Sequence, residues 1–204
     1  DSNPRIRYSD TSLYRFLTHF QPSSICDLLP QPAVESPLRL FLYPWGTFRQ
    51  GELVSAKNPW MSRFCGPSSE KFISDEFDRT IQLYHEVRRV GYRPWQFGNT
   101  FIGGTFLRSS DGASRFVVLQ GNHRMAILAH LGEQRVAVRN ISGYLSEVRE
   151  HDCLRWPLVA NNQCSKDYAL RIFRLFFTEN GDHVRRALGV TEENIRGQAI
   201  HYAL

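Results

Sequence analysis

The stretch FVVLQGNHRMAILAHLG, residues 116–132, decides the fold expected for this chain. A β-branched run ends at Gln120, Gly121 follows, and the polar residues Asn122 and His123 precede Arg124 and an apolar segment. This order predicts a strand that turns directly into a helix. The first backbone N–H groups of such a helix have no helical acceptor, and they lie at the positive end of the helix dipole.

The segment from Gly121 to Arg124 therefore predicts a phosphate-binding bend. Because Gly121 has no side chain, an anion can approach its backbone, and His123 and Arg124 add donors beside the amides. The alternative is purely structural, with Arg124 paired to a core carboxylate and His123 capping a turn. The neighbouring sequence favours the phosphate-binding interpretation.

The whole sequence predicts an α+β fold with a mixed sheet. Strands are expected at residues 38–43, 52–56, 101–107, 115–120 and 135–140. Helices are expected at residues 12–20, 75–90, 125–131 and 165–178, with a further turn or two at 182–188. Ser74 is the candidate cap and Gly91 the candidate stop of the helix at 75–90. A hairpin turn at Ser109–Gly112 joins two strands, which makes the sheet mixed rather than all parallel.

Four ordered features resemble the ParB/sulfiredoxin-like superfamily. Asn58-Pro59-Trp60-Met61-Ser62-Arg63 is similar to the family's Asn-Pro-aromatic-x-x-Arg box, and the helix from Phe77 ends at Gly91 with Pro94 beyond it. The Gly121–Arg124 box follows, and Val136–Val138 matches the closing strand. The resemblance covers residues 50–140. It divides the chain into a nucleotide-binding core at 50–140, an N-terminal extension at 1–49 and a C-terminal helical extension at 141–204.

The resemblance implies that Gly121, Asn122, His123 and Arg124 hold nucleotide phosphates and that Arg63 reaches them from its own box. Members of the superfamily include CTP-hydrolysing DNA-partition clamps, ATP-dependent enzymes that repair over-oxidised cysteines, and small-molecule kinases. Fold alone therefore does not select the activity. Cysteine repair is disfavoured because Asn122 stands where those enzymes have a cysteine. A clamp is disfavoured because its box has Arg in place of His123 and because residues 141–204 are too short for the usual DNA-reading helical domain.

The kinase interpretation places fewest demands on the sequence. It predicts transfer of a phosphoryl group from ATP or ADP, with CTP as a further candidate, to a hydroxyl of a polyol, sugar or amino acid with Mg²⁺. His123 would act beside the phosphates, and a carboxylate would orient or deprotonate the acceptor hydroxyl. The candidates for that carboxylate are Glu52, Glu70, Asp75 and Asp78. The superfamily's kinases place an acidic residue near the Arg63 box, where this chain has Lys57-Asn58-Pro59, so the base is not assigned to one position.

The charge balance keeps a second class of function open. The chain has 25 basic and 20 acidic residues, a net charge of +5 and a pI of about 9.2. Its only lysines are Lys57, Lys71 and Lys166, so 22 of the basic residues are arginines, whose planar fork suits phosphate. The alternative function is a nucleic-acid-associated nucleotide hydrolase, clamp or nuclease. Codon bias acting on a solvated surface explains the same composition without any ligand.

Other sequence features predict the cellular location of the protein and the roles of its cysteines and aromatic turns. No apolar run approaches a membrane span, so no membrane partner is expected. Four cysteines without paired spacing predict free thiols, no zinc site and a cytoplasmic location. The start at Asp1, without Met, indicates a trimmed N-terminus. The aromatic turns at Tyr43–Gly46 and 58–60 are expected in the core, with a sugar-binding wall as the alternative, and His130 is expected to be structural.

Overall fold

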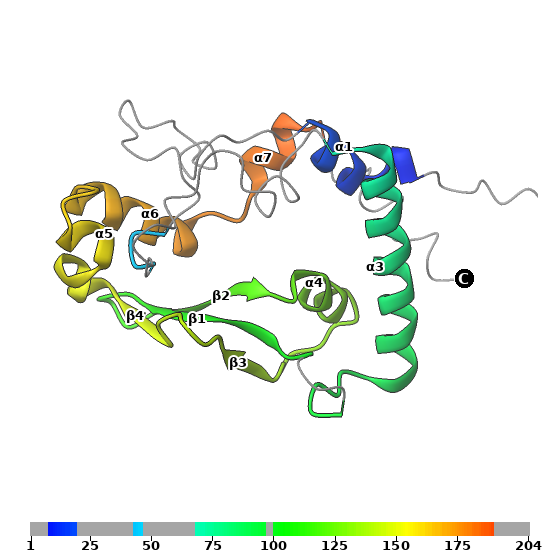
Figure 1. Ribbon diagram of the computed structural model, residues 1–204, viewed down its shortest axis with the longest axis horizontal. Helices are drawn as coiled ribbons and strands as arrows, with labels where there is room; N and C mark the ends of the chain where they lie inside the picture. The colour runs from blue at the N-terminus through cyan, green and yellow to red at the C-terminus, as the bar shows by residue number, and fades with distance from the viewer. Residues whose placement is uncertain (1–7, 20–42, 47–67, 97–99, 190–204) are drawn as a thin grey trace, which may run out of the picture. The chain divides into compact units, whose positions relative to one another are not determined.

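The computed structural model describes residues 8–19, 43–46, 68–96 and 100–189, which divide into two compact units. One unit contains residues 8–19, 68–77 and 179–189, and the other contains residues 43–46, 78–96 and 100–178. The long helix α3, Glu70–Val90, runs from the first unit into the second (Figure 1). The boundaries expected at residues 49 and 140 remain a prediction.

The first unit is helical. It contains η1 (Tyr8–Asp10), α1 (Ser12–His19), the beginning of α3, and α7 (Asp182–Ala187). Leu17 and Ile73 are its buried apolar residues, and the ring of Tyr8 lies 5.6 Å from that of Phe77, centroid to centroid. The hydroxyl of Ser69 accepts a hydrogen bond from Phe72 N at 3.2 Å. The cap of α3 is therefore Ser69 rather than Ser74, and the helix begins five residues earlier than the sequence predicted.

The second unit is built on a four-stranded mixed sheet. Its strands are β1 (Ile102–Arg108), β2 (Ser114–Gln120), β3 (Val138–Asn140) and β4 (Glu147–Arg149). β1 is central, antiparallel to β2 and parallel to both β3 and β4 (Figure 1). Ile102–Gly104 pair with β3 and Phe106–Arg108 pair with β4, so the two short strands follow one another along one edge of β1. The predicted mixed α+β architecture is confirmed at this level.

The second unit contains the end of α3 and four further helices. These are α4 (Asn122–His130), η3 (Glu150–Arg155), α5 (Pro157–Ala160) and α6 (Lys166–Thr178). Val87 of α3, Ile102 of β1, and Ile127 and Leu128 of α4 form one apolar cluster. A second cluster is aromatic, with Trp45, Trp156 and Phe173 fully enclosed. The expectation that Tyr43–Gly46 belongs to the core is confirmed for Trp45, whereas residues 58–60 lie outside the described ranges.

Several predicted boundaries are corrected by the structure. α4 begins at Asn122, three residues before the predicted start, because the left-handed Gly121 lets the helix follow the strand at once. The predicted strand at 135–140 is reduced to Val138–Asn140, and β4 was not predicted. The strands expected at 38–43 and 52–56 lie largely outside the described residues, so they remain predictions. Among the described helices, none has the length and apolarity that a membrane crossing requires.

Candidate functional site

The bend between β2 and α4 requires glycine at position 121. Gly121 has φ 88° and ψ 28°, a left-handed conformation that costs other residues energy. A Cβ at this position would lie 3.2 Å from Ile102 Cγ1 and 3.3 Å from Ile102 Cα. Both the dihedral angle and the close approach to β1 therefore disfavour a side chain, and the predicted strand–glycine–helix junction is confirmed.

The first three residues of α4 precede its backbone hydrogen-bond ladder. No side chain caps the helix, and the bond from Met125 N to Gly121 O, 2.9 Å long, is the first bond of its ladder. The amides of Asn122, His123 and Arg124 precede that bond, so helix geometry gives them no acceptor. Gly121 is half-buried and Asn122 is exposed, which leaves the bend open to solvent. The arrangement can therefore accept an anion at the positive end of the helix dipole.

Arg124 connects α4 to the beginning of β1. Its Nη1 donates to the carbonyl oxygen of Thr100 and, at 3.3 Å, to that of Phe101. These partners are backbone carbonyls, and within the described residues no ion pair joins Arg124 to a carboxylate. Within the described residues, no hydrogen bond involves Nε or Nη2 of this guanidinium. The side chain is thus fixed at one nitrogen and keeps donors for a ligand at the others.

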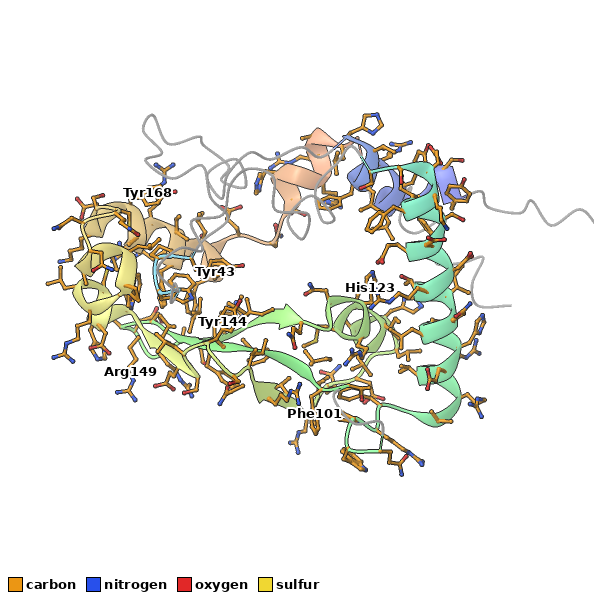
Figure 2. The ribbon with its side chains drawn as sticks, in the orientation of Figure 1. Tyr43, Phe101, His123, Tyr144, Arg149 and Tyr168 are labelled. Atoms are coloured by element: carbon orange, nitrogen blue, oxygen red, sulfur yellow. The ribbon has the colours of Figure 1, made fainter. Side chains whose placement is uncertain are left out.

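His123 lies on the first turn of α4 and is half-buried. Figure 2 shows it on the side of α4 away from Phe101.

His130, at the other end of α4, has its ring centroid 5.9 Å from that of Tyr84 on α3. This contact agrees with the structural role expected for His130.

The carboxylates proposed as catalytic residues have different surroundings. Glu70 accepts hydrogen bonds from the hydroxyls of Tyr14 at 2.8 Å and Tyr8 at 3.5 Å, and the bond to Glu70 is the main reason that the pKa of Tyr14 is raised. Asp75 pairs with Lys71 at 3.0 Å, one turn away on the exposed face of α3. Both residues belong to the first unit and have local structural roles there.

Asp78 is the described candidate carboxylate in the same unit as α4, and it is exposed. Within the described residues, no hydrogen bond or ion pair joins Asp78 to α4. Glu52 and Arg63 lie outside the described ranges, as does the whole Asn58–Arg63 box. The assignment of a catalytic base therefore remains a prediction.

One enclosed carboxylate of the second unit, Glu150, is not predicted from the sequence. Glu150 is 9% exposed and accepts hydrogen bonds from Ser110 N at 2.9 Å and Arg174 Nε at 2.7 Å. These bonds, first of all that from the Ser110 amide, hold its pKa below the ordinary value of 4.5. Its role is to join the hairpin turn to α6, and no periodic sequence signal marks it.

Within the described residues, no three or more His, Cys, Asp or Glu side chains converge to form a metal site. Cys153 and Cys164 are buried free thiols, and burial raises the pKa of both, to about 11 for Cys164. Groups with such high pKa values are poor nucleophiles at neutral pH.

In comparisons with known proteins, no family model, no curated sequence and no solved structure matches this chain. The resemblance to the ParB/sulfiredoxin-like superfamily thus depends on the quoted motifs alone. It remains an interpretation of the sequence.

Proposed function

We propose that this chain binds a nucleotide through its phosphates at the start of α4 and acts as a small-molecule kinase of the ParB/sulfiredoxin-like type. The observation that carries the proposal is the bend at Gly121, where an uncapped helix begins at an exposed position. The amides of Asn122 and Arg124 would contact phosphate oxygens, and the Arg124 side chain would add charge from a fixed position. His123 would assist beside them.

Phosphoryl transfer depends mainly on positioning and on neutralising charge on the phosphates. Mg²⁺ would enter the site on the nucleotide's own phosphate oxygens. Among the described candidate bases, Asp78 has an exposed carboxylate in the same unit as α4. Glu70 and Asp75 are already engaged by Tyr14 and Lys71. We therefore rank Asp78 above them as the residue that orients the acceptor hydroxyl.

A substitution at Asn122 tests the binding proposal without damaging the fold. Asn122→Asp places a negative charge in the first turn of α4, which favours the helix dipole but repels phosphate. We expect calorimetry with ATP, ADP and CTP, each with Mg²⁺, to show binding to the original chain and at least about tenfold weaker binding to this variant. Thermal unfolding should show equal or slightly greater stability.

The matched control is Gln163→Glu, which makes the same change in net charge at an exposed position between α5 and α6. It should leave nucleotide affinity unchanged. Equal affinities for the original chain and Asn122→Asp would exclude a phosphate site at this bend.

The kinase step needs its own test because binding alone does not establish turnover. A metabolite pool incubated with each nucleotide should yield a phosphorylated polyol, sugar or amino acid, detected by mass. Asp78→Asn should lower the turnover number and leave nucleotide affinity unchanged, whereas Asp75→Asn should change neither. Tight nucleotide binding with no product from any pool would indicate a binding protein instead.

A further inference from the structure

An exposed tryptophan marks the turn after α3. Trp95 is 65% exposed, although the preceding Pro94 is fully buried. Gln96 N donates to Arg93 O at 3.0 Å, and Thr100 Oγ1 donates to Pro94 O at 3.2 Å. The backbone on both sides of Trp95 is therefore anchored while its ring remains in water. A large aromatic ring held in this way is a common feature of a binding surface.

A second aromatic group lies in the same part of the second unit. The guanidinium carbon of Arg139 on β3 lies 5.8 Å from the ring centroid of Phe101, just before β1. The hydroxyl of Tyr92 accepts a hydrogen bond from Ile102 N at 2.8 Å and donates one to Ala137 O at 3.1 Å. These bonds join the segment after α3 to the beginnings of β1 and β3. Phe101 can be located at this end of the sheet in Figure 2.

Positive charge predominates in this region, with Glu86 and Glu133 at its borders. Residues 88–104 and 134–142 contain no Asp or Glu, and their five arginines are Arg88, Arg89, Arg93, Arg135 and Arg139. All of these except Arg139 are exposed. The helix dipole accounts for the cations in the last turn of α3, but Arg93 and Arg135 lie outside any helix. A helix-end effect therefore does not explain the whole patch.

We propose that Arg93, Trp95, Phe101 and Arg139 form a surface that binds single-stranded nucleic acid. Bases would stack on the Trp95 ring and on the Phe101–Arg139 pair, and Arg93 with Arg135 would contact phosphates. A single strand fits better than a duplex because its bases are free to stack on protein rings. This surface would bind its ligand through aromatic rings and arginines, whereas the α4 bend would bind phosphate through backbone amides. Arg124 links the two, since its Nη1 bonds the carbonyl of Phe101.

The test uses the full chain and labelled oligonucleotides of about 12 nucleotides, without terminal phosphates, as single-stranded DNA, single-stranded RNA and duplex DNA. Fluorescence anisotropy should show binding to a single strand that is tighter than binding to the duplex. The logarithm of the affinity should fall with the logarithm of salt concentration with a slope of about −1.5 to −3, as expected for two to four phosphate contacts. No binding at roughly 50 mM salt, or tighter binding to the duplex, would overturn the proposal.

Variants of Trp95 test the stacking. Trp95→Ala should weaken binding about 5- to 150-fold, and Trp95→Phe should retain most of the affinity because a ring remains. Leu154 is 64% exposed on η3, so Leu154→Ala is the control for removing an exposed apolar side chain, and it should have no effect. Equal affinities of Trp95→Ala and the original chain would contradict a stacking surface. Circular dichroism checks that each variant is folded.

Variants of two arginines test whether the charge acts locally. Arg93→Glu and Arg155→Glu change the net charge equally, but Arg155 lies on η3, where it pairs with Asp152 at 3.6 Å. Arg93→Glu should weaken single-strand binding by at least about tenfold, and Arg155→Glu should change it much less. Equal losses would mean that the overall positive charge, and no defined surface, attracts the strand. The Asn122→Asp variant should bind the oligonucleotide normally. Failure of the oligonucleotide test can therefore be distinguished from failure of the nucleotide-binding test.

Discussion

Two arginines of the second unit differ in the kind of partner they have. Arg174 donates from Nε to Glu150, a carboxylate that also receives the Ser110 amide, and together these groups join the hairpin turn to α6. Arg124 donates from Nη1 to two backbone carbonyls at the start of β1. Both side chains link elements that are distant in the sequence. Within the described residues, an ion pair with a carboxylate is found for Arg174 and not for Arg124.

This difference separates a closed structural contact from one that can still bind a ligand. At Glu150 the positive and negative charges offset each other, and the carboxylate is almost fully enclosed. At Arg124 a carbonyl accepts a hydrogen bond without neutralising the guanidinium, and the positive end of the α4 dipole lies beside it. We therefore expect the α4 bend, and not the Glu150 contact, to attract anions.

The largest effect should follow from removing the enclosed carboxylate. Glu150→Ala leaves Ser110 N without its acceptor and deletes a charge-assisted bond to Arg174, so we expect a loss of about 2–3 kcal/mol in the free energy of unfolding. The Arg174 side chain is largely solvent-exposed, so its own charge remains hydrated. Urea unfolding measures the change. Glu150→Gln, which keeps an oxygen acceptor, should lose less, and equal losses would show that the carboxylate's charge contributes nothing.

The same carboxylate should make stability depend on pH. Its pKa in the folded protein is lowered from 4.5, chiefly by the Ser110 amide and also by Arg174. As the pH falls below about 4.5, the unfolded chain takes up the proton first, so the stabilisation present at neutral pH is lost as the pH falls through the folded-state pKa. Unfolding measured between pH 7 and pH 3 should give a shallower decline for Glu150→Gln than for the original chain. Parallel curves would contradict this assignment.

Next in size is the effect of adding a methyl group at the bend. Gly121→Ala combines a left-handed φ with a Cβ 3.2 Å from Ile102 Cγ1, and we expect a loss of about 1–2 kcal/mol. Gly112, in the hairpin turn, has φ 90° and no atom within 4 Å of the position that a Cβ would occupy, so Gly112→Ala isolates the cost of the dihedral angle. The difference between the two variants in urea unfolding measures the contact with Ile102. If both lose the same stability, β1 does not constrain the bend.

The α4 bend was predicted well because the residues that determine it are adjacent in the sequence. A β-branched strand, one glycine and an apolar helix specify a left-handed junction with little help from the rest of the chain. The stop of α3 at Gly91, with φ 74°, was predictable for the same reason. Its start was not, because Ser69 and Ser74 are both acceptable caps, and Tyr8, Tyr14 and Phe77 favour the longer helix through tertiary contacts.

The contacts that escaped prediction join residues that are distant in the sequence. Glu150 meets Ser110 forty positions away, and nothing near either residue indicates the pair. β4 has three residues, which are too few to show an alternating pattern. It forms a strand because the edge of β1 beyond β3 is available for pairing. Whether the predicted carboxylates approach the bend depends likewise on long-range placement. Asp78 was therefore a candidate by residue type and not by geometry.

The smallest effect should come from a carboxylate only three residues from Glu150. Glu147 accepts bonds from Arg149 Nε at 2.6 Å and Arg108 Nε at 3.0 Å, and these bonds lower its pKa. Solvent reaches Glu147 and its two partners, so water readily replaces either partner. Such exposed ion pairs contribute little to stability. Glu147→Gln should leave the melting temperature within error of the original, although it neutralises a carboxylate with two arginine partners, whereas Glu150→Gln neutralises a carboxylate with one. If the two variants were equally destabilised, the number of arginine partners, and not enclosure from water, would decide which contacts hold this unit together.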